Sequence, residues 1–502
     1  MKPPAKSPAA TADLVDGVWQ PCSRELDVVL EDPATGEPIS RAVASSPERV
    51  ERALTAAASL HTGEGWAGLA DEERAGALET AAAAVEARVP EIVRAEAFAT
   101  GVPLAQTSGL GVIVGGAFRM AAARLRAGLL HTTAVRPDGR SVEVRRAPRG
   151  PALCVVPYNA PAPMAAHKAA SALAAGCPVV VKAPELAPYG TQMLVEAAAE
   201  GLTAAGAPPA VLQLLHGDGS TGARLVADDG IRVVSFTGGT AAGRDVAAVC
   251  GRALKPVQLE LGGNNPLIVM PDADVDIAGR VAAELLTTLN GQWCRALGRL
   301  VVPARLLTEV LDATAAVLTG VRVGDPLDLD TGYGPLAHSR HRAKALAAVE
   351  SLTGAGAKAR PLTGVPERGN YLPPLLVTGA PEAATREEIF GPVAAVHPYA
   401  DEAVAVALAN STGYGLEGYV VGGDETAALS VARRVRAGEV KVNGSSLLSL
   451  HTETPRPAWG LSGLVDEGTD ETILHFTGAR VTGVEGAFAL HTPGVGAQRG
   501  AP

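Results

Sequence analysis

Between residues 152 and 263, five short apolar runs alternate with alanine-rich stretches. The runs are ALCVVP, CPVVVKAP, AVLQLLH, RVVSFTGG and PVQLELGG. Uninterrupted apolar runs of this length are typical of strands buried on both faces, and repeated β-α-β units build a parallel sheet that helices cover on both sides. Ligands of such sheets bind beyond the carboxyl ends of the strands. The residues that end these five runs are therefore the first candidates for function.

The chain on either side of this region predicts a larger α/β protein. Residues 46–62 start with a helix signal and continue with helical spacing, and we expect two alanine-rich helices over residues 71–101. Residues 131–150 alternate valine with polar residues around a Pro-Asp-Gly turn, which predicts a β-hairpin. A second α/β block runs from about 264 to about 440. Because 502 residues exceed one hydrophobic core, the predicted fold is α/β, with two α/β domains, parallel-rich sheets and a protruding hairpin.

Charge and cysteine content exclude several classes of protein. The formal net charge is -10 and no basic run occurs, so we expect no nucleic-acid partner. No segment offers about 18 uninterrupted apolar residues and the first residues lack an apolar signal region, so we expect no membrane partner and a cytoplasmic location. The five cysteines lack CxxC spacing, which favours free thiols and argues against a metal site. The Pro- and Ala-rich ends, residues 1–12 and 489–502, are predicted to be disordered.

Two glycine clusters follow predicted strands. The sequence GDGSTG, residues 217–222, has the GxGxxG spacing of a dinucleotide fingerprint, but no acidic residue stands about 20 positions further on, and we favour a plain turn. In SFTGGTAAGR, Gly238, Gly239 and Gly243 lie where a strand passes into a helix. Backbone N–H groups there could face a pyrophosphate, and spacing alone leaves this site and an ordinary turn equally open.

Seven motifs, taken together, identify a family. VVPYNAPAPM, VVVKAPELAP, SFTGGTAAGR, LELGGNNP, NGQWC, EEIFGPV and VKVNG occur in the order found in the aldehyde dehydrogenase superfamily, and the resemblance covers about Leu14 to about Thr482. It implies an NAD(P)-binding domain formed by residues 13–127 and 151–262 and a catalytic domain formed by residues 263–462. A hairpin at 128–150 and a strand at 478–488 would serve oligomerisation, which implies a homodimer or a homotetramer.

The resemblance assigns three catalytic residues. Cys294 matches the nucleophile of the GQxC motif, although an isolated cysteine is otherwise a small packing residue. Its attack on an aldehyde produces an oxyanion, and the family's donors are the side chain of Asn159 and the backbone N–H of Cys294. Glu260, inside an apolar run, matches the general base. Branches that pass the acyl group to coenzyme A commonly lack this glutamate, so the resemblance favours hydrolysis to a free acid.

The resemblance also implies a nicotinamide cofactor. Lys182 and Glu185 match the pair that contacts the adenosine ribose, although a lysine that closes a strand is otherwise a solvated charge. A carboxylate facing the ribose repels a 2′-phosphate, so NAD is favoured while NADP stays possible. The remaining implied cofactor residues surround the pyrophosphate and the nicotinamide ribose: Pro157, Tyr158, Gly238, Gly239, Glu388 and Phe390. For Phe390, core packing is the alternative.

The chain departs from the family pattern near the substrate. Asn264 replaces a common lysine, Leu297 stands where glycine is usual, and the C-terminal PFGGxKxSG becomes PRPAWGLSG at residues 455–463. The expected pocket residues, which suggest a wider and more polar tunnel, are Ala160, His167, Trp293 and Arg295. We hypothesise that Arg295 or His167 binds a carboxylate or other polar tail on the aldehyde, with Trp293 as an apolar wall. Pairing of Arg295 with a protein carboxylate is an equal alternative.

The sequence thus predicts an NAD(P)-dependent aldehyde dehydrogenase that oxidises a small-molecule aldehyde to its acid through a cysteine thioester. Two alternatives stay open. One is a semialdehyde or acyl-transferring dehydrogenase of a biosynthetic pathway. The other is a degenerate, non-catalytic scaffold, which the joint presence of Cys294, Glu260, Asn159 and Lys182 disfavours.

Overall fold

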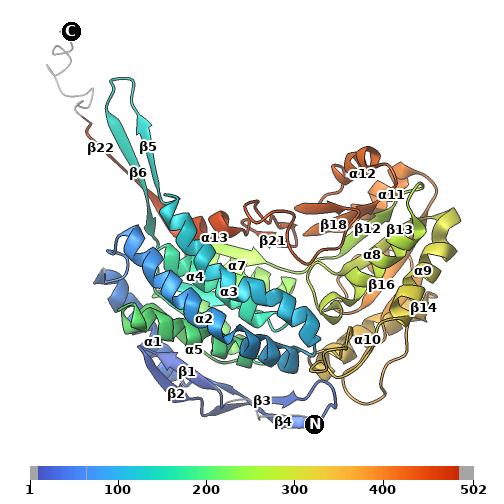
Figure 1. Ribbon diagram of the computed structural model, residues 1–502, viewed down its shortest axis with the longest axis horizontal. Coiled ribbons are helices and arrows are strands. Elements are labelled where there is room, and N and C mark those ends of the chain that lie inside the picture. The colour runs from blue at the N-terminus through green and yellow to red at the C-terminus, as the bar shows by residue number, and fades with distance from the viewer. Residues whose placement is uncertain (1–9, 64, 486–502) are drawn as a thin grey trace.

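The computed structural model describes residues 10–63 and 65–485 and contains two open sheets in two neighbouring α/β units (Figure 1). The first unit holds an eight-stranded sheet in the order β2-β1-β9-β8-β7-β10-β11-β21, and the second holds a seven-stranded sheet in the order β14-β15-β16-β13-β12-β18-β19. The predicted fold class, with two α/β domains and a hairpin, is confirmed. None of the described helices is long and apolar enough to cross a membrane.

The centre of the first sheet consists of the five apolar runs. They form β7 (Ala152–Val155), β8 (Val179–Lys182), β9 (Leu212–Leu215), β10 (Val233–Thr237) and β11 (Val257–Glu260), and all are parallel and buried. Antiparallel partners close both edges: β1 (Ala12–Val15) with β2 (Val18–Pro21), and β21 (Gly463–Leu464). The predicted β-α-β rhythm is therefore confirmed, and the carboxyl ends of five strands meet at one edge.

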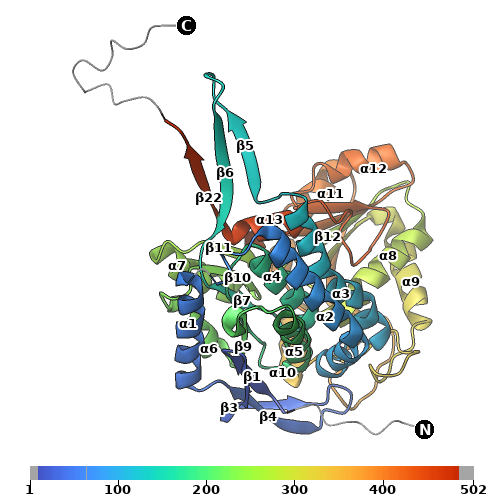
Figure 2. The ribbon, with the colours of Figure 1, turned by 60° about the vertical axis from the view of Figure 1, so that its left-hand side comes forward.

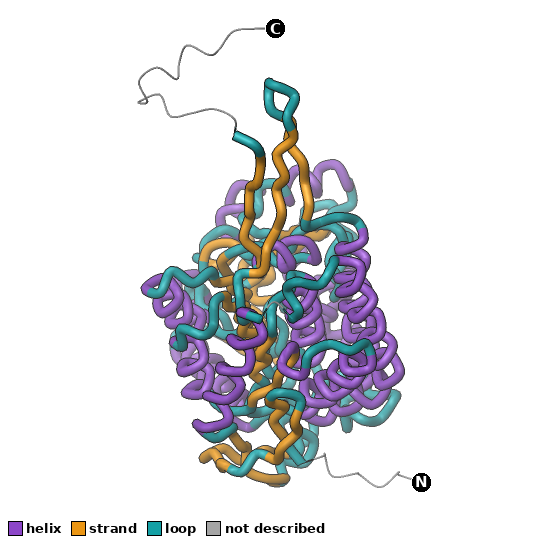
Figure 3. The backbone as a smooth tube through the Cα atoms, turned by 90° about the vertical axis from the view of Figure 1, so that its left-hand side faces the viewer, coloured by secondary structure: helices purple, strands orange, loops and turns teal. Residues whose placement is uncertain are grey.

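Helices cover both faces of this sheet. One face packs against α2 (Asp71–Thr100), α3 (Leu104–Arg126), α4 (Pro161–Ala174) and α5 (Tyr189–Ala204). The other face packs against α1 (Pro47–Thr62), α6 (Gly219–Ala227) and α7 (Thr240–Arg252), as Figure 3 shows from the side. A short 3-10 helix, η1 (Pro209–Val211), precedes β9.

One expected helix boundary is wrong. Residues 71–100 form the single helix α2, which continues through Pro90 and ends at Gly101 in a left-handed conformation with φ of 75°. A proline inside a helix costs about 3 kcal/mol because it removes one hydrogen bond and crowds the preceding turn. Apolar residues on both sides of Pro90, among them Val85 and Ile92, are fully buried in the core, and this burial offsets the cost.

The second unit repeats the layered design. Its parallel strands are β12 (Asn265–Val269), β13 (Leu297–Pro303), β15 (Leu375–Thr378), β16 (Val393–Tyr399), β18 (Glu417–Val421) and β19 (Glu439–Val442), with β14 (Lys358–Pro361) antiparallel at the edge. The helices are α8 (Val275–Thr287), α9 (Leu307–Thr319), α10 (Ser339–Gly354), α11 (Glu402–Ala409) and α12 (Glu425–Ala432), with the short η3 (Ala304–Leu306) and η4 (Glu382–Thr385).

A three-stranded sheet projects from the body (Figure 2). It consists of the predicted hairpin, β5 (His131–Val135) and β6 (Ser141–Pro148), and of β22 (Thr477–Gly483), which pairs antiparallel with the whole of β6. Residues 486–488 of the predicted strand at 478–488 lie outside the described residues. Most of the two tails predicted to be disordered also lie outside them. The smaller elements are β3 (Arg24–Glu31) with β4 (Pro38–Ala44), β17 (Tyr414–Gly415) with β20 (Trp459–Gly460), and α13 (Thr469–His475).

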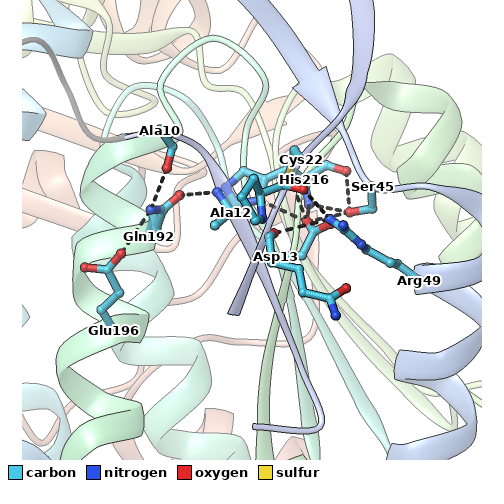
Figure 4. A network of polar contacts seen from close by, with 11 residues as sticks. Ala10, Ala12, Asp13, Cys22, Ser45, Arg49, Gln192, Glu196 and His216 are labelled. Atoms are coloured by element: carbon cyan, nitrogen blue, oxygen red, sulfur yellow. Dashed lines mark hydrogen bonds and ion pairs between the residues drawn. The ribbon is translucent and has the colours of Figure 1, made fainter. Parts of the chain in front are cut away.

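A buried polar network joins β1 to the end of β9 (Figure 4). The carboxylate of Asp13 accepts hydrogen bonds from Ser45 Oγ at 2.7 Å and from the backbone N–H of His216 at 3.2 Å, and it pairs with Arg49 at 3.1 Å. The thiol of Cys22 donates to the same carboxylate at 3.2 Å, and burial raises the pKa of that thiol. Asp13, Cys22 and His216 lie close enough to share a metal ion, but each is already a partner in these hydrogen bonds.

Candidate active site

A cavity of about 460 Å³ is lined by residues of both units. The first unit contributes α3, the loop from Pro157 to Ala160, and the carboxyl ends of β10 and β11. The second contributes the segment around Cys294, the loop containing Glu388 and Phe390, and residues between 447 and 456. Of the fifteen residues predicted for the site, all but Lys182 and Glu185 line this one cavity.

A left-handed turn places Cys294 in the cavity. The 3-10 helix η2 (Thr288–Gly291) has positive φ at Leu289 (49°), Asn290 (57°) and Gly291 (73°). Left-handed backbone is unfavourable for residues with a Cβ, so surrounding contacts must hold it. The Asn290 side chain supplies them, since it donates to the carbonyl oxygens of Gly101 at 2.7 Å and Pro335 at 2.8 Å.

Further hydrogen bonds fix the backbone on the other side of the thiol. The Asn265 amide donates to the carbonyl oxygens of Cys294 at 2.9 Å and Ala296 at 2.8 Å, and the Tyr419 hydroxyl donates to that of Arg295 at 2.8 Å. Gly263 is required here, because a Cβ at this position would collide with the Cys294 carbonyl oxygen. The nucleophile is therefore held by both units before any substrate binds.

Asn159 lies beside the same segment. Its side-chain amide donates one hydrogen bond to the carbonyl oxygen of Gln292 at 2.8 Å, which orients the amide toward the cavity wall that Cys294 shares. An amide nitrogen carries two hydrogens, so the second stays available to a ligand oxygen. The arrangement can hold an oxyanion on a carbon attached to the thiol.

Glu260 ends β11 with its side chain 7% exposed. It lies next to the Cys294 thiol on the wall of the cavity. Burial, followed by the charge of Glu467, raises the pKa of Glu260, and burial followed by the charge of Glu260 raises the pKa of Cys294 well above its usual value. The thiol therefore keeps its proton at rest, and Glu260 is the group placed to receive it.

The cofactor residues surround the other end of the cavity. Helix α7 begins after Gly239 with no side-chain cap, and a Cβ on Gly239 would meet only open space. The carboxyl of Glu388 accepts the backbone N–H of Gly263 at 2.9 Å, and burial raises its pKa to about 7. Phe390 packs edge-on against Tyr158 with ring centroids 6.1 Å apart while also lining the cavity. An uncapped helix N-terminus bordering a cavity fits a pyrophosphate.

The strand ends farther out hold an ion pair and a turn. Lys182, at the end of β8, is 3.6 Å from the carboxylate of Glu185, and burial lowers the pKa of this lysine. In the GxGxxG segment, the Asp218 carboxylate accepts the backbone N–H groups of Ser220 at 3.0 Å and Thr221 at 3.3 Å. A protein carboxylate already caps α6, so this segment is the plain turn that the sequence favoured.

The hypothesis that Arg295 or His167 binds a charged tail does not fit the structure. Arg295 is 2% exposed, and its guanidinium pairs with Glu417 and, at 3.3 Å, with Glu439. This is the alternative considered above, in which Arg295 pairs with a protein carboxylate. The His167 ring contacts Thr472 Oγ1 at 3.1 Å, and burial lowers its pKa to about 4, so it is neutral at pH 7. Neither residue offers a free positive charge.

Sequence reasoning missed three charged residues near the thiol. Lys168, fully buried in α4, donates to Ser235 Oγ and to the carboxylate of Glu467, both at 2.7 Å. Arg456 lines the cavity from the PRPAWGLSG segment. A lysine within the alanine-rich run of α4 was a signal for a buried ion pair, and an arginine in an altered motif was a signal for a changed pocket.

Comparisons with known proteins identify the family of the chain. A family model described as "Aldehyde dehydrogenase family" matches residues 19–482. Geranial dehydrogenase of Castellaniella defragrans is 36% identical over 442 residues, which cover 86% of this chain and 90% of that protein. The 3-succinoylsemialdehyde-pyridine dehydrogenase of a Pseudomonas species is 34% identical over 451 residues, with 86% and 90% covered. The solved structure of an NAD-dependent aldehyde dehydrogenase from Sinorhizobium meliloti has a TM-score of 0.88 at 28% identity, with 97% of each chain covered.

Proposed function

The chain belongs to the aldehyde dehydrogenase family, and from this premise we propose that it is an NAD-dependent enzyme that oxidises an aldehyde to a carboxylic acid through Cys294. The observation that carries the proposal is the convergence of a thiol, an amide and a carboxyl group, from Cys294, Asn159 and Glu260, on one cavity. The proximity of the thiol to the carboxyl group of Glu260 makes the set usable for nucleophilic catalysis.

In the first step, Glu260 accepts the thiol proton as sulfur attacks the aldehyde carbon. The oxyanion of the resulting thiohemiacetal is held by the Asn159 amide and by the backbone N–H of Cys294. Each such donor contributes about 3–4 kcal/mol to the transition state. NAD, when bound, accepts the hydride from this carbon and leaves a thioester on Cys294.

The cofactor end of the cavity fits NAD. The uncapped start of α7 at Gly239 would face the pyrophosphate, and Glu388 and Phe390 would hold the nicotinamide ribose. Glu185, beside Lys182, would accept hydrogen bonds from the adenosine ribose and repel a 2′-phosphate, which favours NAD over NADP. The Sinorhizobium meliloti relative is described as NAD-dependent as well.

Release of the acid needs a base for water, and Glu260 can take this second role once the proton that it received from the thiol has passed to solvent. Its carboxyl borders the cavity next to Cys294, and burial raises its pKa toward the range of an efficient general base. Hydrolysis is favoured over transfer to another acceptor for this reason. The named substrates of the two curated relatives differ, so they support aldehyde oxidation in general and no single aldehyde.

The test is an aldehyde panel, with NAD and NADP in parallel and without coenzyme A. We expect reduced cofactor and free carboxylic acid to form in equal amounts, faster with NAD. Cys294→Ser should lose activity while still binding NAD, measured by calorimetry. Binding of NAD without turnover of any aldehyde would instead support the scaffold alternative, and a requirement for coenzyme A would support acyl transfer.

A further inference from the structure

Arg456 is anchored at the cavity through its backbone. Its N–H donates to the carbonyl oxygen of Glu467 at 2.6 Å, and the N–H of Glu467 returns a bond to the carbonyl oxygen of Arg456 at 3.2 Å. The segment between them joins the first sheet, because β21 pairs with β11 and the N–H of Leu261 donates to the Ser462 carbonyl oxygen at 2.8 Å. The guanidinium therefore extends from a fixed point.

Within the described residues, the guanidinium of Arg456 has no hydrogen bond or ion pair. Its Nε is buried without a partner, which costs free energy unless a ligand supplies an acceptor. The neighbouring cations differ in this respect, since Lys168 pairs with Glu467 and Arg295 pairs with Glu417. Lys344, also at the cavity, is exposed and lies on the cofactor side near Glu388.

The charge of Arg456 acts on the reaction centre from the substrate side. It lowers the pKa of Cys294, of Glu260 and of His167, so all three lie within its electrostatic reach. In the described part of the chain no carboxylate forms a hydrogen bond or a close ion pair with it, although its charge lowers the pKa values of Glu260 and Glu467. Arg456 thus brings to the cavity a hydrogen-bond donor that no acceptor in the described residues has taken up.

The remaining walls on this side are mostly apolar, with polar residues such as Thr452 and Thr454 among them. One face of α3 lines the cavity through Leu110 and the residues three, six, seven and ten positions after it, which is the spacing of a single helix face. They are Leu110, Ile113, Gly116, Ala117 and Met120. At Gly116 an added Cβ would meet nothing within 4 Å, so this glycine leaves room beside the wall. Trp293 and Leu447 line the cavity as well.

We propose that Arg456 determines substrate specificity by binding a carboxylate on an aldehyde whose body is apolar. The inference rests on the proposed function and names the substrate class of that same cavity. The apolar walls would take up the carbon skeleton, and the guanidinium would form a charge-assisted hydrogen bond with the acid group, bidentate where the geometry allows. The hypothesis of an acid-binding arginine is thereby transferred from Arg295 to Arg456.

The experiment compares carboxylate aldehydes with their methyl esters, which are similar in shape and uncharged. Succinic semialdehyde and 4-carboxybenzaldehyde provide a short and a long pair. Wild-type enzyme should favour the acids in kcat/KM. Arg456→Gln should lower kcat/KM for the acids by about 10- to 100-fold, mainly through KM, and change the esters by less than about 3-fold, since hydrogen bonds to charged groups contribute about 1.5–3 kcal/mol. Arg456→Lys should keep part of the preference.

Two control variants separate charge from position and from space. Lys344→Gln removes a positive charge from the cofactor side and should leave the ratio of acid to ester unchanged. Gly116→Leu fills the apolar wall and should slow the longer acid and the longer ester alike. Equal losses on acids and esters in Arg456→Gln would show that Arg456 acts on Cys294 or Glu260, and would overturn the proposal.

Absence of any acid preference in the wild-type enzyme would also overturn it, and that measurement does not depend on the folding of a variant. These outcomes differ from a failure of the proposed function. If wild-type enzyme oxidises neither acids nor esters with NAD, the assigned reaction itself is wrong. If it oxidises the esters as fast as the acids, only the role of Arg456 is wrong.

Discussion

At the scale of single residues, Cys294 and Glu260 control each other's protonation. Burial disfavours both charged forms, and the charge of Glu260 raises the pKa of Cys294 further. The thiol and the carboxyl group line the same cavity and interact, so the proton that sulfur loses on ionisation can pass to Glu260. The proton transfer becomes favourable when sulfur bonds to a substrate carbonyl carbon whose oxygen is held by Asn159.

Glu260→Gln keeps the shape of the side chain and removes its ability to accept a proton. We expect kcat to fall by about 10²- to 10⁴-fold. Because the carboxylate is the active form and burial raises the pKa of Glu260, wild-type activity should rise with pH through that pKa, and the variant should lack this rise. Steady-state rates of NAD reduction between pH 5 and pH 9 measure both effects.

The exposed neighbour Glu387 gives a matched control, since Glu387→Gln removes one carboxylate from the loop of Glu388 and should keep the wild-type pH profile. A rising limb that persists unchanged in Glu260→Gln would assign the base to another group.

Single residues also show what the sequence could and could not predict. Cys294, Asn159 and Glu260 were predicted because each stands in a motif whose spacing is local. The partners of Arg295 were not predictable, because Glu417 and Glu439 follow it by 122 and 144 positions and meet it only after two strands pair. The free charge of Arg456 likewise depends on which carboxylates other cations have already bound.

At the scale of elements, hydrophobic pattern predicted the parallel strands better than the helix ends. Runs such as VVVK are buried on both faces, and a pattern set by burial is visible in sequence. The sequence predicted two helices over residues 71–101, whereas one helix continues through Pro90 because packing of residues such as Ile92 outweighs local propensity.

A buried carboxyl links three of these helices. The carboxyl of Glu96 in α2 lies near the backbone N–H of Ala162 in α4, and so close to Gly190 of α5 that a Cβ there would collide with it. Burial raises the pKa of Glu96 to about 8, from an ordinary value of 4.5. The folded protein therefore binds this proton more tightly than the unfolded chain does.

The resulting stabilisation is complete below about pH 4.5 and is lost as the pH rises to about 8, at no more than about 1.4 kcal/mol per pH unit. Glu96→Gln cannot ionise, so its free energy of unfolding should improve relative to wild type across that range and level off above it. Urea titrations from pH 5 to pH 9 measure the difference. Glu91→Gln changes an exposed residue of the same helix, and its free energy of unfolding should vary with pH as that of wild type does. The same pH dependence in Glu96→Gln and wild type would contradict the prediction.

At the scale of the whole molecule, the projecting sheet has two unlike faces. One row across its three strands joins Val481, Val144 and Thr132, and the next row on that face joins Gly483, Val142 and Ala134. The opposite face carries charged residues, with Arg480 beside Arg145 and Thr482 beside Glu143. Val481 is 66% exposed on the first face, which is uncharged in these two outer rows and carries Arg146, beside Ala479, in the row nearer the body. Exposed apolar surface on a projecting sheet is typical of an interface.

We therefore predict that the protein forms a homodimer or homotetramer through the first face of this sheet. Val481→Lys should raise the dissociation constant by about 10- to 100-fold, because a lysine buried there would lack a partner. Light scattering across a dilution series measures the shift. Thr482→Lys is the matched control, since it introduces the same charge one residue away, beside Glu143 on the opposite face, and should leave the assembly intact.

The two variants distinguish the faces as well as the assembly. A monomeric wild-type protein at all concentrations would contradict the prediction. Dissociation by Thr482→Lys with an intact Val481→Lys oligomer would place the interface on the charged face instead. Since the cavity is lined by residues of a single chain, dissociated Val481→Lys should still oxidise aldehydes, and its activity would show that assembly and catalysis are separable.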